Sequence, residues 1–117
     1  MSAAPVEIRL SADKTALTVA FDDGAAFALE AELLRTHSPS AEVQGHTPLE
    51  RKLVSGKRGV KIARLDPVGH YAVRIVFDDS HDSGLFTWGY LRELGEGRED
   101  KWRAYLAELA AKGFTRG

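Results

Sequence analysis

The chain has 117 residues, with 16 lysines and arginines, 17 aspartates and glutamates, and no cysteine. This length allows one ordinary domain with its own core. The lack of cysteine excludes disulfides, thiolate-bound metal and a cysteine nucleophile. The formal charge of -1 excludes a globally basic nucleic-acid-binding protein, although a local basic patch is compatible with it.

The N-terminus has neither the basic region nor the apolar run that marks a signal peptide. No apolar stretch approaches the roughly 20 residues that span a bilayer. The sequence therefore predicts a cytoplasmic protein that does not associate with a membrane.

Three short stretches before residue 30 alternate apolar and polar side chains, with turn residues between them. This period of two predicts an antiparallel meander. Residues 30–35 predict a short helix that ends before Pro39, because the residue before a proline avoids the helical region. Residues 38–59 show little periodicity and predict a long loop.

The second half begins with two predicted strands, residues 60–65 and 71–77, joined by a turn over residues 66–69 in which Pro67 fixes φ. A short third strand is expected around residues 84–86. Residues 19–24 resemble residues 75–80. In each stretch a predicted strand ends in phenylalanine, and two aspartates follow it at a turn. Because turn chemistry alone selects such residues, this echo predicts two similar hairpin turns.

The end of the chain predicts two helices. The first has Thr87 as its N-cap and Gly95 as its stop. The second starts near Glu99 and ends at a Gly113 C-cap, with apolar residues at helical spacing. Strands early and helices late define a small single domain of the α+β class.

The first candidate for chemistry is the acidic run 78–82, whose aspartates and His81 could bind a divalent metal. It is not an EF-hand loop, because the sixth position is Ser83 and the twelfth is Gly89. The alternative is a solvated turn in which aspartate side chains accept hydrogen bonds from backbone amides.

The histidines show no i, i+4 pair of the kind that binds zinc on a helix. A site built in three dimensions from His37, His46 and His81 cannot be read from spacing, and His70 is expected to be exposed. No serine-nucleophile elbow is present. Five aromatic residues are predicted to pack in the core or in an interface: Trp88, Tyr90, Trp102, Tyr105 and Phe114.

Residues 51–64 carry basic side chains and no acidic one, so they could meet phosphate or an acidic partner. The stretch lacks interleaved aromatics for base stacking and has no Walker A spacing. A solvated basic loop is the alternative. The basic residues are Arg51, Lys52, Lys57, Arg58, Lys61 and Arg64.

Several segments together resemble the gamma-butyrobetaine hydroxylase-like N-terminal domain family. They are Phe21-Asp22-Asp23-Gly24, Leu34-Arg35, Ser38-Pro39-Ser40-Ala41-Glu42-Val43, Gly45-His46, Pro67 to Arg74, and Phe77 to Gly84 before Trp88 and Tyr90-Leu91.

The resemblance covers residues 5–95 of the single domain 1–117, leaving 96–117 as a C-terminal helical extension. It implies a small α+β module built on antiparallel strands. In carnitine-pathway hydroxylases this module precedes an iron- and 2-oxoglutarate-dependent oxygenase domain, and a similar domain is appended to some Mrp-type iron–sulfur carrier ATPases. In many bacteria it stands alone. The oxygenase domain is absent from this chain, so hydroxylase activity is not carried over.

The hydroxylase version of the module binds a structural zinc through three cysteines and a histidine. These positions fall on Ser38, Ser40, Val43 and His81, and serine and valine are unsuited to zinc. The resemblance therefore implies that the zinc site is lost and that hydrogen bonds from Ser38, Ser40 and His81 hold the loop to the hairpin. The alternative is a rebuilt site with His81, His46 and either Glu42 or Asp82.

We therefore expect a non-catalytic binding or accessory module with a protein partner, no nucleic acid and no required cofactor. Iron–sulfur protein maturation or oxygenase-type partners are the setting that the resemblance implies. Arg35 and Trp88 join Ser38 and Ser40 as candidate interaction or structural residues. The alternatives are a zinc or iron protein, or a metal-dependent enzyme, using His46 and His81. A further alternative is nucleic-acid or acidic-partner binding through residues 51–64.

Overall fold

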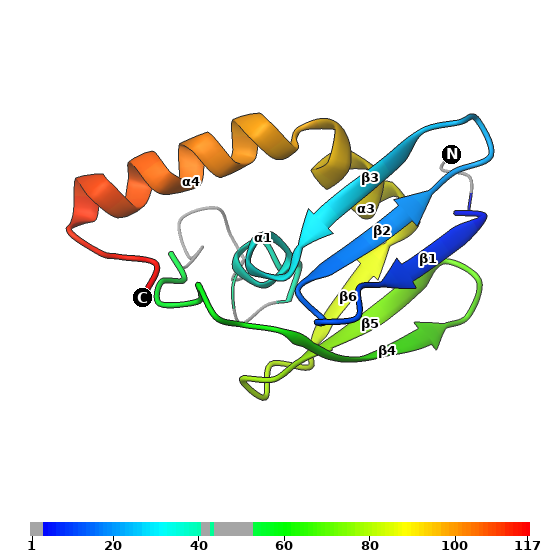
Figure 1. Cartoon of the computed structure of the whole chain (residues 1–117), viewed down its shortest axis with the longest axis horizontal. Coiled ribbons are helices and arrows are strands. Elements are labelled where there is room, and N and C mark those ends of the chain that lie inside the picture. The colour runs from blue at the N-terminus through cyan, green and yellow to red at the C-terminus, as the bar shows by residue number, and fades with distance from the viewer. Residues whose placement is uncertain (1–3, 41–42, 44–52) are drawn as a thin grey trace.

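The computed structural model describes residues 4–40, 43 and 53–117. It contains two three-stranded antiparallel sheets with helices beside them, which confirms the α+β class (Figure 1). In chain order the described elements are β1 (Glu7–Leu10), β2 (Ala16–Ala20), β3 (Ala26–Glu30), α1 (Ala31–Thr36), β4 (Ile62–Val68), β5 (Ala72–Phe77), β6 (Gly84–Thr87), α3 (Trp88–Glu96) and α4 (Arg98–Lys112).

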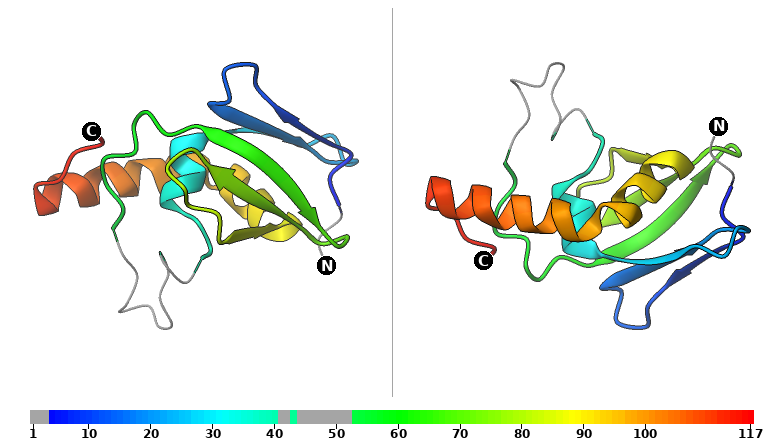
Figure 2. Two further views of the ribbon diagram at one scale, coloured as in Figure 1. Left: turned by 90° about the horizontal axis from the view of Figure 1, so that it is seen from below. Right: turned by 90° about the horizontal axis from the view of Figure 1, so that it is seen from above.

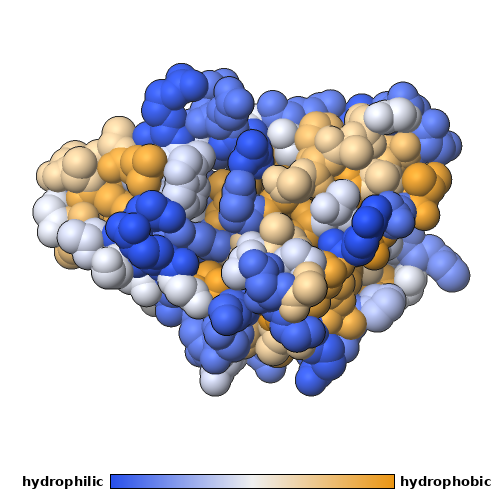
Figure 3. All heavy atoms as spheres, viewed as in Figure 1, coloured by the Kyte–Doolittle hydropathy of each residue, from blue (hydrophilic) through white to orange (hydrophobic). Residues whose placement is uncertain are grey.

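The first sheet is the predicted meander, with strands in the order β1-β2-β3. Leu17 on β2 pairs with Leu29 on β3, and both are fully buried. The alternate positions face outward, as the period of two requires. Apolar colours gather over this sheet on the face shown in Figure 3. The outward positions of β2 and β3 are small or polar: Ala16, Thr18, Ala20, Ala26, Ala28 and Glu30.

The second sheet has the order β4-β5-β6, and β5 is the predicted central strand. The predicted turn over residues 66–69 is wrong, because β4 continues to Val68 and Pro67 pairs with Val73. A proline is tolerated there because β4 is an edge strand, where one side of the backbone has no ladder partner. The chain reverses beyond it, where Gly69 has a φ of 55°.

The core lies between the inner faces of the two sheets and is closed by α1 and α3 (Figure 2). Val19 from the first sheet and Ile75 from the second belong to one buried cluster, together with Leu34 from α1 and Leu91 from α3. Burial of such side chains stabilises a fold by about 1.5–3 kcal/mol each. The sandwich therefore holds α1 and the turn after β5 in fixed positions.

The helix α3 begins as predicted, since the Thr87 hydroxyl accepts a hydrogen bond from the amide of Tyr90. It ends two residues later than predicted, with Gly97 rather than Gly95 as its C-cap. Gly95 instead brings the helix against the ring of Phe27 on β3, where an added Cβ would lie 2.3 Å from a ring carbon.

The last helix, α4, ends at Gly113, whose φ of 72° confirms the predicted C-cap. Phe114 is 49% exposed, so it does not pack in the core, and its place in an interface stays a prediction. The tail then turns back beside residues 53–59 (Figure 1). The Gly56 and Arg58 amides donate to the carbonyls of Thr115 and Arg116 at 3.0 and 2.8 Å.

Candidate functional site

The two echoed turns have the same backbone geometry, as predicted. The amide of Phe21 donates to the carbonyl four residues later at 2.8 Å, and that of Phe77 does the same at 2.9 Å. The residues with positive φ are Gly24 at 90° and Ser80 at 75°. In each turn the second aspartate accepts from the amide two residues later at 3.1 Å. The turns therefore differ only in what surrounds them.

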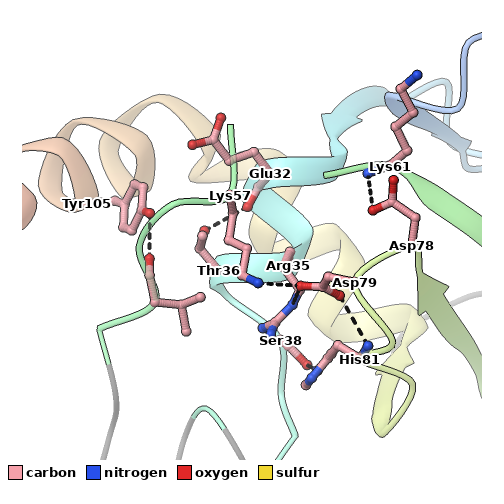
Figure 4. Close-up of polar contacts among 11 residues, drawn as sticks. Glu32, Arg35, Thr36, Ser38, Lys57, Lys61, Asp78, Asp79, His81 and Tyr105 are labelled. Atoms are coloured by element: carbon pink, nitrogen blue, oxygen red, sulfur yellow. Dashed lines mark hydrogen bonds and ion pairs between the residues drawn. The ribbon is translucent and has the colours of Figure 1, made fainter. Parts of the chain in front are cut away.

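Asp79 in the second turn joins three segments of the chain (Figure 4). Its carboxylate accepts from Arg35 Nε on α1 at 2.8 Å and from Lys57 Nζ at 2.6 Å. It also accepts from the backbone amide of His81 at 3.1 Å. The side chain is only 19% exposed, so water screens these pairs weakly.

The same contacts set the charge of this carboxyl. Burial alone would raise the pKa of Asp79, but the hydrogen bonds from Lys57, Arg35 and His81 outweigh it and lower the pKa to about 2. Nη1 of Arg35 is buried and has no hydrogen-bond partner among the residues that the structure describes. The ion pairs with Asp79 therefore offset the cost of burying this guanidinium.

Beside Asp79, the loop after α1 is joined to the hairpin by side-chain hydrogen bonds. Ser38 Oγ lies 2.9 Å from His81 Nε2, and Ser40 Oγ lies 2.7 Å from Ser83 Oγ. This agrees with the expected contacts of Ser38, Ser40 and His81. A Cβ on Gly84 would lie 2.5 Å from Ser38 Oγ, so this approach requires a glycine.

The residues at this joint do not suit zinc. Two of the four positions carry serine hydroxyls, which are poor ligands, and Val43 is a buried apolar side chain. His81 is the remaining donor, and its Nε2 already contacts Ser38. Among the described residues no group of three histidine, aspartate or glutamate side chains lies close enough to hold a metal ion.

The rebuilt metal site cannot be assembled from the described residues. Asp82 is exposed in the hairpin and His81 contacts Ser38, while the other two proposed ligands lie outside the described part of the chain. The same holds for the first half of the basic stretch. The candidate residues outside the described ranges are Glu42, His46, Arg51 and Lys52.

In the described part of the basic stretch, two of the basic side chains form ion pairs with aspartates. Lys57 pairs with Asp79, and Arg64 pairs with Asp66 at 2.9 Å. The backbone amide of Arg58 is occupied by the C-terminal tail. Nucleic-acid binding by this stretch remains a prediction.

Two other candidates support the fold. The indole of Trp88 donates to the carbonyl of His70 at 2.7 Å, which ties the start of α3 to the turn between β4 and β5. Arg35 forms the ion pair with Asp79. His70 is exposed, as expected. His37 Nδ1 lies 3.1 Å from the carbonyl of Leu33.

A cavity that the sequence did not predict lies between the end of α1 and the helices α3 and α4. Its volume is about 500 Å³. The hydroxyl of Tyr90 donates to the carbonyl of His37, and that of Tyr105 donates to the carbonyl of Val54 at 2.6 Å. The sequence signal that relates to this cavity is the clustering of aromatic residues near the end of the chain. The described lining residues are His37, Pro39, Tyr90, Glu93, Lys101, Ala104, Tyr105 and Glu108.

Comparison with known proteins identifies the class of this domain. The family described as gamma-butyrobetaine hydroxylase-like, N-terminal matches residues 8–92. The chain belongs to this family. Trp102 and Arg116 lie beyond the matched region. No curated protein matches the chain.

Solved structures of similar proteins support the same assignment. One NMR solution structure has 45% identity and a TM-score of 0.85, and covers 99% of this chain and 91% of its own. A second has 43% identity and a TM-score of 0.82, with coverage of 97% and 84%. A crystal structure of a DUF971 family protein of unknown function from Acidithiobacillus ferrooxidans has 38% identity and a TM-score of 0.66, with coverage of 79% and 92%.

The described helices give no sign of a membrane span. None of them combines the length and the apolar character needed to cross a bilayer.

Proposed function

We propose that this chain is a non-catalytic module that binds another protein. The observation that supports the non-catalytic part of this proposal most strongly is the buried contact between Ser38 and His81. A catalytic serine or imidazole must reach a substrate. Ser38 has no exposed surface and His81 is 5% exposed, so these two groups serve the packing of the loop against the hairpin.

The partner surface in this proposal is the cavity between α3 and α4. Tyrosine is enriched in protein interfaces because it combines a large apolar ring with one polar group. Tyr105 is 2% exposed and donates its hydroxyl proton to Val54, so it supports the wall of the cavity, while the half-buried Tyr90 is the tyrosine that a partner can reach. Glu93 adds carboxylate oxygens, one of which lies 3.6 Å from Lys101 Nζ, and Ala104 leaves space on the helix. These groups suit an extended partner segment that presents amide or basic donors.

The biological setting comes from the family alone. Members occur with oxygenase domains and with iron–sulfur carrier ATPases, so we propose a partner in iron–sulfur protein maturation or among oxygenase-type enzymes. The domain would then act as an accessory that recognises the partner, and the partner would supply the chemistry.

Substitution of Ala104 tests the proposed surface. Ala104→Arg places a long cationic side chain in the cavity, and we expect it to lower recovery of a specific partner at least fivefold. Recovery is measured by affinity capture with the full chain, quantitative mass spectrometry, and titration of the purified partner. The helix should tolerate the change, because arginine is nearly as good a helix former as alanine.

Ala110→Arg is the matched control, since it makes the same change at an exposed position of α4 outside the cavity. It should leave recovery unchanged. If both variants recover the partner as well as the wild-type chain does, docking at this cavity is contradicted. The same holds if both variants lose it to the same extent.

A further inference from the structure

Glu32 near the start of α1 is a deeply buried acid whose carboxylate pairs with Arg116 among the described residues. Its side chain is 7% exposed, while Asp79, the next most buried acid in an ion pair of the described residues, is 19% exposed. Oε2 accepts from Arg116 Nε at 3.0 Å and Oε1 accepts from Nη2 at 2.7 Å. The pair is therefore bidentate, which is the geometry that a guanidinium fits and an ammonium does not.

An aromatic ring completes this site. The Arg116 Cζ lies 5.1 Å from the centroid of the Trp102 ring on α4. A guanidinium that stacks on an indole while pairing with a buried carboxylate is held from two directions. Glu32 and Trp102 together thus select a planar cation, and they come from two separate helices.

The backbone around Arg116 is held by two main-chain hydrogen bonds from residues 56 and 58. The carbonyls of Thr115 and Arg116 accept from the amides of Gly56 and Arg58 at 3.0 and 2.8 Å. Main-chain pairing of this kind is independent of side chains and is a common way to bind an extended segment. The tail therefore binds to the rest of the molecule in the manner of a short peptide with one specific side chain.

Little else among the described contacts holds this tail. It follows the left-handed Gly113 at the end of α4, and Phe114 is half exposed. A cavity of about 280 Å³ lies beside the guanidinium, with Glu30, Arg98 and Glu99 on its wall in addition to the site residues. An arginine arriving from solvent would have space to enter.

We propose that Glu32 and Trp102 form an arginine-binding site, that Arg116 fills it as an intramolecular ligand, and that an arginine in an extended segment of a partner protein replaces the tail. The tail's own binding mode defines the ligand, which is a short backbone segment that carries one guanidinium and accepts main-chain hydrogen bonds. The choice of a protein occupant rests on the proposed binding role. The site itself shares no residue with the cavity between α3 and α4, so the two proposals can fail separately.

Peptide titration of the Arg116→Ala chain tests the site. The probe is the peptide Phe-Thr-Arg-Gly, and the signal is the indole N–H of Trp102 in proton–nitrogen NMR spectra. We expect a saturable shift, with binding at least fivefold tighter than to the wild-type chain, because the tethered Arg116 competes at high effective concentration. The indole of Trp88, bonded to His70, serves as the internal reference.

Two changes check specificity. Binding should be lost in the Arg116→Ala, Glu32→Gln chain and should weaken at least fivefold when the peptide carries lysine in place of arginine. Equal binding of the lysine peptide, or no saturable shift in Arg116→Ala, would overturn the proposal. So would a wild-type dimer that Arg116→Ala abolishes, since the occupant would then be a second copy of this chain. If Arg116→Ala does not fold, Arg116→Lys is used with the same criteria.

Discussion

Asp79 shows how one carboxylate can fix the position of three segments. Its partners Arg35 and Lys57 are 44 and 22 residues away in sequence. The equivalent residue of the first turn, Asp23, pairs with Arg92 in a much more exposed position, where its side chain is 52% exposed. Exposed pairs contribute about 0–1 kcal/mol, whereas breaking a buried pair leaves an uncompensated charge.

We therefore expect Asp79→Asn to lower the free energy of unfolding by about 1–3 kcal/mol at pH 7, because it leaves Arg35 and Lys57 without their carboxylate. The pKa of Asp79 is lowered to about 2, so its stabilising effect is present above the unfolded pKa of about 4 and is lost as the pH falls towards 2. Urea unfolding at pH 7, 4 and 2.5 should show the difference between the two chains shrinking.

Asp82→Asn makes the same change at an exposed position of the same hairpin. It should alter the free energy of unfolding by less than about 0.5 kcal/mol at any of these pH values. A loss equal to that of Asp79→Asn would show that the hairpin responds to any lost charge.

Sequence reasoning predicted the turn around Asp79 but not its ion pairs. The turn depends on local chemistry, because two aspartates followed by a residue that accepts positive φ define it. Arg35 and Lys57 reach the turn only after the sheets pack. The contact between Ser38 and His81 is predicted only by the family resemblance, because the two residues are 43 positions apart in sequence.

At the scale of elements, the contact between α3 and β3 depends on Gly95. Glycine costs about 1 kcal/mol relative to alanine inside a helix. Here it is required, because a Cβ would lie 2.3–2.7 Å from the ring atoms of Phe27. The nearest ring carbon is Cγ, which lies on the axis about which the ring flips, so a ring flip does not relieve the contact.

Gly95→Ala should therefore lower the free energy of unfolding by about 1–3 kcal/mol, despite the better helix propensity of alanine. Thermal and urea unfolding measure this. Gly97→Ala is the control, because the nearest atom to its Cβ is the flexible Lys101 Cε at 3.3 Å. It should change the stability by less than about 0.5 kcal/mol, and a stable Gly95→Ala chain would refute the close contact.

Most elements were predictable because their signals are periodic and local. The meander, β5 and the Thr87 N-cap follow directly from alternation and capping residues. The error at Pro67 arose because proline indicates either a turn or an edge strand, and only the assembled sheet shows that β4 lies at an edge.

For the whole molecule, the core between the two sheets should be sufficient for folding. We expect the purified chain to contain less than about 0.1 equivalent of zinc or iron, and its melting temperature to change by less than about 1 °C with a chelator. Elemental analysis and calorimetry test this. Stoichiometric metal whose removal unfolds the protein would instead support the rebuilt site with His46 and His81.

A chain with cysteine at positions 38, 40 and 43 is the matched comparison. Ser38→Cys, Ser40→Cys and Val43→Cys together supply three thiolates beside His81, and this variant should bind one zinc ion and melt at a lower temperature after chelation. It shows that the assay detects a metal at this joint when suitable ligands are present.

The pairing of Glu32 with Arg116 also has a consequence for how the protein is made. The two residues are 84 positions apart, and synthesis delivers Glu32 long before the tail. The residues of β1, β2, β3 and α1 all precede Arg116 by about 80 positions or more, so this carboxylate spends part of synthesis without its guanidinium. The ion pair therefore forms only after the segments that position Glu32 have been made.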